Sequence, residues 1–254
     1  MNVLVLGGTQ EAQVIARELV ERGYHVIYSM AGLGIKPQLG CVVRSGGFGG
    51  HEGLSDHLAV NNIDCLVDAT HPYAEKISRS AIIAAHDLSI PLYRYTRPAW
   101  EPQEGDDWKT VRNNWPAITL ATLPYKRPFF TIGRQPLFHM DDVPVRQEWL
   151  IRTLAASDTG NNRVRVLRSR GPFVRQSEVS LMRLTGVDVL VSKNSGGDMV
   201  AAKIEAAREL NIPVMMVQRP KLAPTKNDFS TPQAMLDAMP RPKSVNVEVK
   251  SQAI

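Results

Sequence analysis

The sequence predicts an α/β protein with two doubly wound parallel sheets, and three observations support this prediction. Short apolar runs alternate with segments of helical periodicity along most of the 254 residues. Several of these runs end in glycine-rich or polar turns, which is typical of strands at the ligand-binding edge of a parallel sheet. A chain of this length can bury either one large core or two smaller ones.

The first half of the chain begins with a strand, a helix and a second strand. Residues 2–6 are an apolar run, and apolar residues between 12 and 20 recur at helical spacing until Gly23, which suits a helix end. Residues 26–31 form the next apolar run. The remaining elements expected here are strands at 41–44, 64–68 and 91–95 and helices at 54–61 and 74–87.

The second half repeats this alternation after a linker. Residues 99–109 are acidic and contain proline without periodicity, and a short strand at 108–112 ends this stretch. Strands are expected at 129–133, 148–155, 163–167, 188–192 and 213–217, with helices at 174–185, 199–210 and 231–239. We therefore expect one domain over residues 1–100 and a second over residues 110–240.

One more strand is expected at the end of the chain. Val245, Val247 and Val249 alternate with polar residues within 244–251, which is the pattern of a half-buried strand. A strand that follows a complete domain must pair elsewhere, and the prolines on both sides of Arg241 indicate that the chain crosses back.

Composition excludes several classes of protein. The hydrophobic content of 43% and charged content of 22% are those of an ordinary globular protein. No apolar run approaches the roughly 20 residues that span a bilayer, and the N-terminus lacks the features of a signal peptide, so we expect a cytoplasmic protein without membrane contact. Cys41, Cys65 and the six histidines lack metal-ligand spacing, which predicts no metal site.

Charge is distributed unevenly along the chain. Residues 1–124 carry 10 Lys and Arg against 13 Asp and Glu, whereas residues 125–254 carry 20 against 12, a net charge of +8. A basic half suits either a polyanionic partner or a solvated cationic face. The arginine-rich stretch 163–175 has only Phe173 as an aromatic residue, although nucleic-acid sites interleave aromatics with charge. We therefore expect small acidic ligands and no nucleic acid.

Two glycine-rich turns in the first half could receive phosphate groups. Gly7, Gly8 and Thr9 stand between a strand and a helix, where backbone N–H groups attract phosphate, although Thr9 could equally be only an N-cap. Residues 45–50, SGGFGG, hold four glycines in five positions, which favours close approach of a ligand over a mobile loop. Arg44 precedes this loop, near the position where dinucleotide-binding folds meet a 2′-phosphate.

Polar residues also follow strands in both halves. The segment DATHPYA, residues 68–74, follows the fourth strand, and its place at the ligand edge favours a functional role over an ordinary surface loop. The segment LVSKNSGG, residues 190–197, places Lys193 between a strand and two glycines, as in an anion cradle or a solvated loop. Residues 131–135, TIGRQ, are a third such turn with a cation.

Taken together, these residues resemble the precorrin-6A reductase family of cobalamin biosynthesis. The resemblance rests on motifs that occur in family order along nearly the whole chain: LGGTQEA, GGFGG, DATHPYA, RPAW, TIGRQ, GPF, LVSKNSGG and IPVMMVQRP. It implies two Rossmann-like domains that flank a cleft and exchange a strand. Strand 244–251 would then join the N-terminal sheet, and strand 108–112 would join the second sheet.

The resemblance implies an oxidoreductase that uses NADPH. The reaction would be hydride reduction of a double bond of the precorrin-6A macrocycle to give precorrin-6B. This substrate carries many carboxylates, which suits the basic second half. Because hydride transfer is the chemistry of the nicotinamide, the protein would mainly orient the two rings. An internally exchanged strand needs no second chain, so we expect a monomer.

The resemblance further implies roles for individual residues. Gly7, Gly8 and Thr9 would contact the pyrophosphate and Arg44 the adenosine ribose or its phosphate. The two loops expected to flank the nicotinamide half contribute Gly46, Gly47, Phe48, Gly49, Thr70 and Pro72. The side chains and turns expected to hold substrate carboxylates, or to reach the cofactor, are Arg134, Arg170, Lys193, Asn194, Ser195 and Gly196.

Reduction also requires a proton. His71, Tyr73 and Lys193 are the candidate donors, with His71 preferred over Tyr73, and bulk solvent is an equal alternative source. 

Three alternative functions remain open at this point. The chain could be a cobalt-precorrin-6A reductase of the anaerobic route using NADH, another NAD(P)-dependent reductase or epimerase, or a nucleotide-binding regulatory module without catalysis. The Tyr-x-x-x-Lys pair of short-chain dehydrogenases is missing, because Ile77 stands four positions after Tyr73. A regulatory module would not need the cations that Lys193 and Arg134 bring to turns of the second domain.

Overall fold

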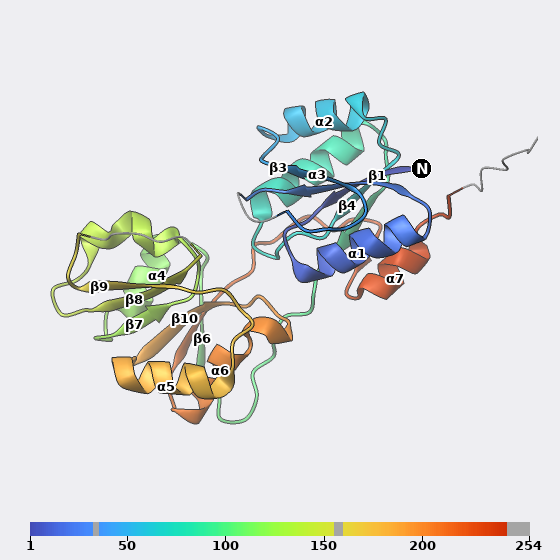
Figure 1. Ribbon diagram of the computed structural model, residues 1–254. Coiled ribbons are helices and arrows are strands. Elements are labelled where there is room, and N and C mark those ends of the chain that lie inside the picture. Colours follow the sequence, from blue (N-terminus) through green and yellow to red (C-terminus); the bar gives the residue numbers. More distant parts are fainter. Residues whose placement is uncertain (33–35, 155–159, 243–254) are drawn as a thin grey trace, which may run out of the picture. The chain divides into compact units, whose positions relative to one another are not determined.

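The computed structural model describes residues 1–32, 36–154 and 160–242. The chain divides into two compact units: unit 1 comprises Met1–Thr96 and the chain from Leu222 onward, and unit 2 comprises Arg97–Lys221. Each unit contains a six-stranded parallel sheet with helices packed on it (Figure 1). The expected α/β fold with two parallel sheets is therefore confirmed.

The sheet of unit 1 has the order β12-β5-β4-β1-β2-β3. Its strands are β1 (Asn2–Leu6), β2 (His25–Met30), β3 (Val42–Ser45), β4 (Cys65–Asp68), β5 (Leu92–Tyr95) and β12 (Asp228–Phe229). Helices α1 (Gln10–Glu21) and α7 (Pro232–Ala238) lie side by side on one face (Figure 1), and α2 (His51–Val60) and α3 (Glu75–Asp87) pack together on the other.

Burial on both faces explains why β1 is a continuous apolar run. Val3 and Val5 pack into the core beneath α1 and α7, whereas Leu4 and Leu6 pack into the core beneath α2 and α3. A strand that alternates between two cores needs apolar residues at every position. The helix after it ends as expected, because Gly23 follows with φ +85°, a left-handed conformation that glycine adopts without a steric cost.

The sheet of unit 2 has the order β6-β11-β10-β7-β8-β9. Its strands are β6 (Trp108–Val111), β7 (Pro128–Phe130), β8 (Trp149–Thr153), β9 (Val164–Arg168), β10 (Val189–Lys193) and β11 (Val214–Val217). Helices α5 (Arg175–Thr185) and α6 (Ala202–Glu209) pack on one core through Met182 and Ile204. Sequence periodicity did not predict α4 (Trp115–Thr122) or the 3₁₀ segment Gln135–Asp142. The helix expected at 199–210 consists of the 3₁₀ segment Asp198–Val200 followed by α6.

The chain crosses between the two sheets twice. Strand β6 pairs with β11, as expected for residues 108–112. The expected boundary near residue 240 is corrected, because β12 pairs with β5 and α7 buries Met235 and Leu236 in the core of unit 1. The strand that returns is thus β12, and an ion pair between Arg94 and Asp228 at 2.6 Å joins it to β5. The strand expected at 244–251 lies outside the described residues.

Candidate functional site

The turn after β1 is held by the strand next to it and by its own helix. The N–H of Gly7 donates to the carbonyl of Ser29 at 2.8 Å, and the N–H of Gly8 donates to the hydroxyl of Tyr28 at 2.8 Å. The Oγ1 of Thr9 accepts from the N–H of Ala12 at 3.1 Å, so Thr9 is the N-cap of α1. The same hydroxyl donates to the carbonyl of Ala69 at 3.0 Å, which joins the turns after β1 and β4.

Glycine occurs at positions 7 and 8 of this turn for two different structural reasons. A Cβ on Gly7 would lie 2.4 Å from ring carbons of Tyr28, so only glycine lets this fully buried ring approach. Gly8 has φ +109° and no heavy atom within 4 Å of a Cβ position, so open space lies beside the start of α1. The first N–H groups of a helix lack intrahelical partners and attract phosphate. The start of α1 therefore has room for an anion, although the N–H groups of Gly7 and Gly8 are already hydrogen-bonded and Thr9 contributes a cap rather than a free hydroxyl.

Arg44 organises the glycine loop at residues 45–50. Its Nη1 donates to the Oγ of Ser29 at 2.8 Å and to the carbonyl of Gly46 at 3.2 Å, and its Nη2 donates to the carbonyl of Gly47 at 3.1 Å. The guanidinium lies 3.9 Å from the centre of the Phe48 ring. Burial lowers the pKa of Arg44.

The glycines of this loop border open space. A Cβ on Gly46, Gly47, Gly49 or Gly50 would meet no heavy atom within 4 Å. Three of the four, Gly46, Gly49 and Gly50, have φ between +81° and +125°, which strains any other residue. The loop is therefore shaped by glycine and leaves room for a ligand beside Arg44.

Strand order assigns the two loops of unit 1 to opposite sides of β1. The SGGFGG loop, which begins next to Arg44 of β3, lies beyond β2 on one side, whereas DATHPYA follows β4 on the other side. In dinucleotide-binding sheets, the two halves of the cofactor extend to opposite sides of the central crevice. The strand order places the two loops on opposite sides of β1, and the expectation that both flank the nicotinamide stays a prediction.

The DATHPYA loop is stiffened by its own polar groups. The buried Oδ1 of Asp68 accepts from the N–H of Thr70 at 3.1 Å and from its Oγ1 at 2.7 Å, and this Oγ1 lies 3.2 Å from the Oγ of Ser78. The Nδ1 of His71 accepts from the N–H of Tyr73 at 3.2 Å. A neutral His71 therefore carries its proton on Nε2.

The loop places four side chains near one another at the end of β4. The ring centres of His71 and Tyr73 are 5.7 Å apart, with Pro72 between the two residues in sequence. Thr70, His71, Pro72 and Tyr73 are all partly exposed, so each could meet a ligand.

The turn after β10 packs against residues 97–100 and forms hydrogen bonds with them. The side-chain amide of Asn194 accepts from the N–H of Trp100 at 2.7 Å and donates to its carbonyl at 2.9 Å. A Cβ on Gly196 would lie 2.0 Å from the carbonyl oxygen of Pro98, and Ser195 is buried. Arg219 donates to the carbonyls of Asn194 at 2.7 Å and Arg97 at 2.8 Å.

These contacts give two of the residues predicted to bind substrate, Asn194 and Gly196, a structural role within unit 2. Asn194 and Gly196 close the turn, while Lys193 is the charged residue of this turn. Burial lowers the pKa of Lys193. Arg134 is exposed at the start of the 3₁₀ segment Gln135–Asp142.

A cavity of about 210 Å³ lies at the carboxyl ends of β7, β8 and β9 in unit 2. It contains Arg170, one of the predicted residues, and residues of the TIGRQ turn. The lining residues are Thr131, Gly133, Arg152, Thr153, Leu154, Ser169, Arg170, Gly171, Phe173, Val200 and Lys203.

Arg152 and Glu178 form a buried ion pair beside this cavity. Nη1 and Nη2 of Arg152 each donate to a carboxylate oxygen of Glu178 at 2.8 Å. The guanidinium lies 4.9 Å from the ring centre of Phe129 and 4.2 Å from that of Phe173. Within the described part of the chain, the buried Nε of Arg152 and Oγ of Ser169 have no hydrogen-bond partner. Unsatisfied buried groups of this kind indicate a site for a polar ligand or water.

Lys203 adds a second buried cation to the same cavity. It is 5% exposed, and its Nζ lies 5.3 Å from the ring centre of Trp100. Burial lowers its pKa to about 8, with Arg152 lowering it further and Glu178 opposing this shift. Arg152, Glu178 and Lys203 together carry one excess positive charge when Lys203 is protonated, which an anion can balance.

Sequence reasoning missed Arg152, Ser169 and Lys203. Arg152 stands within the apolar run of β8, and a charged residue inside a buried strand is a signal that could have revealed it. Lys203 was hidden because a lysine near the start of a helix is ordinary in sequence.

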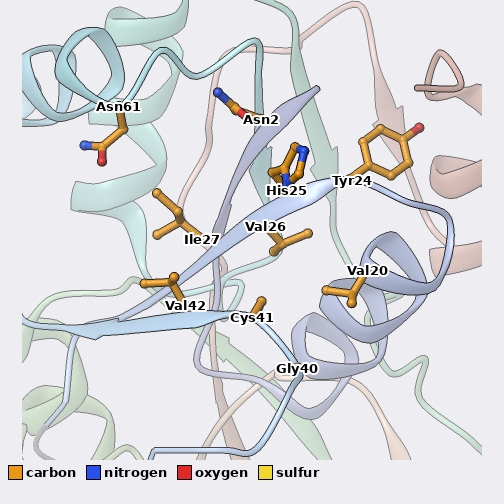
Figure 2. A pocket seen from close by; sticks show the side chains of 10 residues that line it. All are labelled: Asn2, Val20, Tyr24, His25, Val26, Ile27, Gly40, Cys41, Val42 and Asn61. Carbon is orange, nitrogen blue, oxygen red and sulfur yellow. The ribbon is translucent and has the colours of Figure 1, made fainter. Parts of the chain in front are cut away.

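A second cavity, of about 360 Å³, lies in unit 1 at the amino ends of the strands (Figure 2). Its ten lining residues include His25, Cys41 and Val42, and burial raises the pKa of Cys41. Because nucleotides bind at the carboxyl ends of parallel strands, this cavity is at the wrong edge for the cofactor. Among the described residues, no cluster of three or more His, Cys, Asp or Glu could hold a metal ion, and no helix could cross a membrane.

A sequence model of the family described as "Precorrin-6x reductase CbiJ/CobK" matches residues 2–239. The chain belongs to this family. A precorrin-6A reductase of Rhodococcus erythropolis is 41% identical over 88% of this chain and 91% of the relative. A precorrin-6A reductase from a Sinorhizobium species is 38% identical over 92% of this chain and 91% of the relative. A cobalt-precorrin-6A reductase of Priestia megaterium is 30% identical over 87% of this chain and 91% of the relative.

A solved CobK precorrin-6A reductase has the same fold. It superposes with a TM-score of 0.83 at 33% identity and covers 93% of this chain and 95% of its own. As a member of the CbiJ/CobK family, the chain is an oxidoreductase of cobalamin biosynthesis that acts on a tetrapyrrole. A reductase with a Rossmann-like unit of this kind uses a nicotinamide cofactor.

Proposed function

We propose that this chain is a precorrin-6A reductase, which reduces one double bond of the macrocycle to give precorrin-6B with hydride from NADPH. The structural observation that supports an acidic substrate is the cavity of unit 2, which Arg152, Ser169 and Lys203 line. Relatives named precorrin-6A reductases are also more similar to this chain than those named cobalt-precorrin-6A reductases, which favours a substrate without cobalt.

The cavity of unit 2 suits one carboxylate of the substrate. A volume of about 210 Å³ holds an acid side chain rather than a whole macrocycle. The Nε–H of Arg152, the Oγ of Ser169 and the ammonium of Lys203 would each donate to this carboxylate, which would satisfy the two buried groups that lack a partner. Arg170, also in the lining, would add a fourth donor. Such fixed donors would orient the macrocycle for the reaction.

Unit 1 suits the nucleotide. The open side of Gly8 and the N-terminus of α1 would receive the pyrophosphate, and Arg44 would lie near the adenosine ribose. When bound, the nicotinamide supplies the hydride. The DATHPYA loop on the other side of β1 would form the wall of the nicotinamide half, held still by the Asp68–Thr70 hydrogen bonds.

His71 would supply the proton that accompanies the hydride. The proton would come from the imidazolium form, which gives up its Nε2 proton and keeps a proton on Nδ1. Protonation of the ring would therefore first release Nδ1 from the N–H of Tyr73. The expected result for His71→Ala is a slower reduction step with a changed pH dependence, whereas nucleotide affinity stays the same. An unchanged single-turnover rate and pH profile would transfer this role to solvent or Tyr73.

Anaerobic mixing of the purified protein with precorrin-6A and NADPH tests the whole proposal. We expect oxidation of NADPH that depends on the macrocycle, faster than with NADH or with cobalt-precorrin-6A. Ser169→Ala and Lys203→Met should raise KM for the macrocycle, whereas the exposed control Lys126→Met should not. Tight NADPH binding without macrocycle-dependent oxidation would instead indicate a nucleotide-binding regulatory module.

A further inference from the structure

Ser29, at the carboxyl end of β2, joins the two glycine turns of unit 1. Its carbonyl accepts from the N–H of Gly7 at 2.8 Å, and its Oγ accepts from Nη1 of Arg44 at 2.8 Å. Ser29 is only 4% exposed, so its hydroxyl is fixed by the surrounding sheet. The next residue continues the connection, because the carbonyl of Met30 accepts from the N–H of Gly46 at 2.9 Å. The turn proposed for pyrophosphate and the loop with Arg44 thus share one anchor.

Arg44 is a cation without an acidic partner in the part of the chain that the structure describes. Neutral groups accept its hydrogen bonds: Ser29 Oγ and the carbonyls of Gly46 and Gly47. These bonds use three of its five N–H groups, which leaves two for a ligand. One face of the guanidinium lies over the Phe48 ring, so both this stacking and the hydrogen bonds fix its orientation. A partly buried, oriented and unbalanced guanidinium is suited to bind a phosphate.

The residue type at position 29 decides whether this cation stays available. Folds of this kind that bind NAD place an Asp or Glu about 20 residues after the glycine turn, where the carboxylate accepts from the ribose 2′-hydroxyl. In this chain the end of β2 carries Tyr28, Ser29 and Met30 and no acidic residue. A carboxylate at position 29 would pair with Arg44 and repel a 2′-phosphate, whereas the serine hydroxyl orients Arg44 without neutralising it.

We infer that Ser29 is a specificity-determining residue for the cofactor, because it holds Arg44 in place to bind the 2′-phosphate of NADPH. The inference rests on the proposed function and deepens it: Arg44 contacts the phosphate, and Ser29 acts through Arg44 as a positioning residue. The selected ligand is an adenosine nucleotide that carries a 2′-phosphate.

Calorimetric titration with adenosine 2′,5′-bisphosphate and with 5′-AMP tests this inference without any reduction step. The wild-type protein should bind the bisphosphate more tightly. Arg44→Ala should abolish this preference while the Kd for 5′-AMP stays the same. Ser29→Ala should reduce the preference roughly tenfold, the size of one charge-assisted hydrogen bond. Ser29→Asp should abolish the preference for the bisphosphate, because the new carboxylate would pair with Arg44 and neutralise its charge.

Two further variants separate positioning from a general structural effect. Ser29→Thr keeps the hydroxyl and should keep the preference, and the partly exposed Ser80 of α3 provides a matched control in Ser80→Ala. An unchanged Kd for 5′-AMP shows that each variant is folded. If Ser29→Asp does not fold, the comparison of Ser29→Ala with Ser29→Thr decides.

The inference is overturned if Ser29→Ala keeps the wild-type preference, or if Arg44→Ala weakens both nucleotides equally. It is also overturned if the wild-type protein binds the two nucleotides equally and still reduces precorrin-6A with NADH, an outcome that leaves the proposed reductase intact. If neither NADPH nor either nucleotide binds, the proposed cofactor site itself is wrong.

Discussion

The hydroxyl of Tyr28 accepts the N–H of Gly8 at 2.8 Å, and the same buried ring lies against the Cα of Gly7. One side chain thereby sets both the spacing and the direction of the turn after β1. Burial raises the pKa of Tyr28, so its phenol stays protonated across the physiological range. The turn proposed for the pyrophosphate is therefore shaped from beneath by an aromatic residue of the neighbouring strand.

Replacement of Tyr28 by phenylalanine should destabilise unit 1. The N–H of Gly8 would lose its acceptor, so we expect a loss of about 1–2 kcal/mol in the free energy of unfolding. Urea denaturation followed by circular dichroism measures this loss. Tyr125→Phe, at a partly exposed position, is the matched control and should change stability by less than about 0.5 kcal/mol. Equal effects of the two variants would contradict the role given to the Tyr28 hydroxyl.

Gly7→Ala should destabilise the protein because of steric overlap. The added methyl group would lie 2.4 Å from the Tyr28 ring, and overpacking of this kind costs about 1–3 kcal/mol. Gly47→Ala is the comparison, since a Cβ there meets nothing within 4 Å and no positive φ restricts it. We expect Gly47→Ala to leave the unfolding midpoint nearly unchanged. A Gly7→Ala protein as stable as Gly47→Ala would show that the ring can move away.

Glu178→Gln should strongly destabilise unit 2. It leaves the buried Arg152 without its bidentate carboxylate, and loss of one partner of a buried pair costs about 3–5 kcal/mol. Glu148→Gln removes a comparable partner from Arg127 at the surface and should cost less than about 1 kcal/mol. Thermal unfolding of both variants makes the comparison. Similar losses would mean that solvent reaches Arg152.

The buried Lys203 should make stability depend on pH. Burial lowers its pKa to about 8, from an ordinary value of 10.5. Below about pH 8 the ammonium is charged in both states and its burial disfavours folding. Between these two values the unfolded chain binds more protons, so folding stability rises with pH. Lys203→Met should remove this rise. Urea midpoints of the variant and the wild type, each measured at pH 7 and at pH 10, test this, because the difference between the two proteins should change with pH. A constant difference would contradict the prediction.

The two cysteines should react at different rates. Burial and the nearby Asp64 raise the pKa of Cys65 to about 12, and Cys65 is fully buried, whereas Cys41 is partly exposed. Because the thiolate is the reactive form, a disulfide reagent at pH 8 should modify Cys41 slowly and Cys65 only after unfolding. Cys41→Ser should therefore yield a native protein with no reactive thiol. Rapid modification of that variant would show that Cys65 is accessible.

Local sequence patterns predicted most of the regular structure. The apolar runs at 2–6 and 64–68 correspond to β1 and β4, because strands buried on both faces are continuously apolar. The returning segment escaped prediction, since the two residues of β12, Asp228–Phe229, are too few to show a period. Helix α7 was predicted, but its packing on α1 was not, since that contact joins residues far apart in sequence.

The candidate site was predicted less completely than the fold, for a related reason. Motif reading identified turns such as KNSGG but could not show that the amide of Asn194 is used by Trp100. Conversely, Arg152 and Lys203 meet only because the topology of unit 2 places the end of β8 near the start of α6. Residue type and spacing reveal which groups can bind a ligand, whereas long-range contacts decide which of them remain available.

Unit 2 is a continuous stretch, Arg97–Lys221, whereas unit 1 is assembled from both ends of the described chain. A ribosome therefore completes unit 2 before it has made β12 and α7. Until then, the nascent unit 1 lacks Met235 and Leu236, and the core that they share with Ile15 and Leu19 stays uncovered. A premature stop near residue 221 would leave unit 2 whole and give unit 1 an apolar helix face that chaperones and proteases recognise.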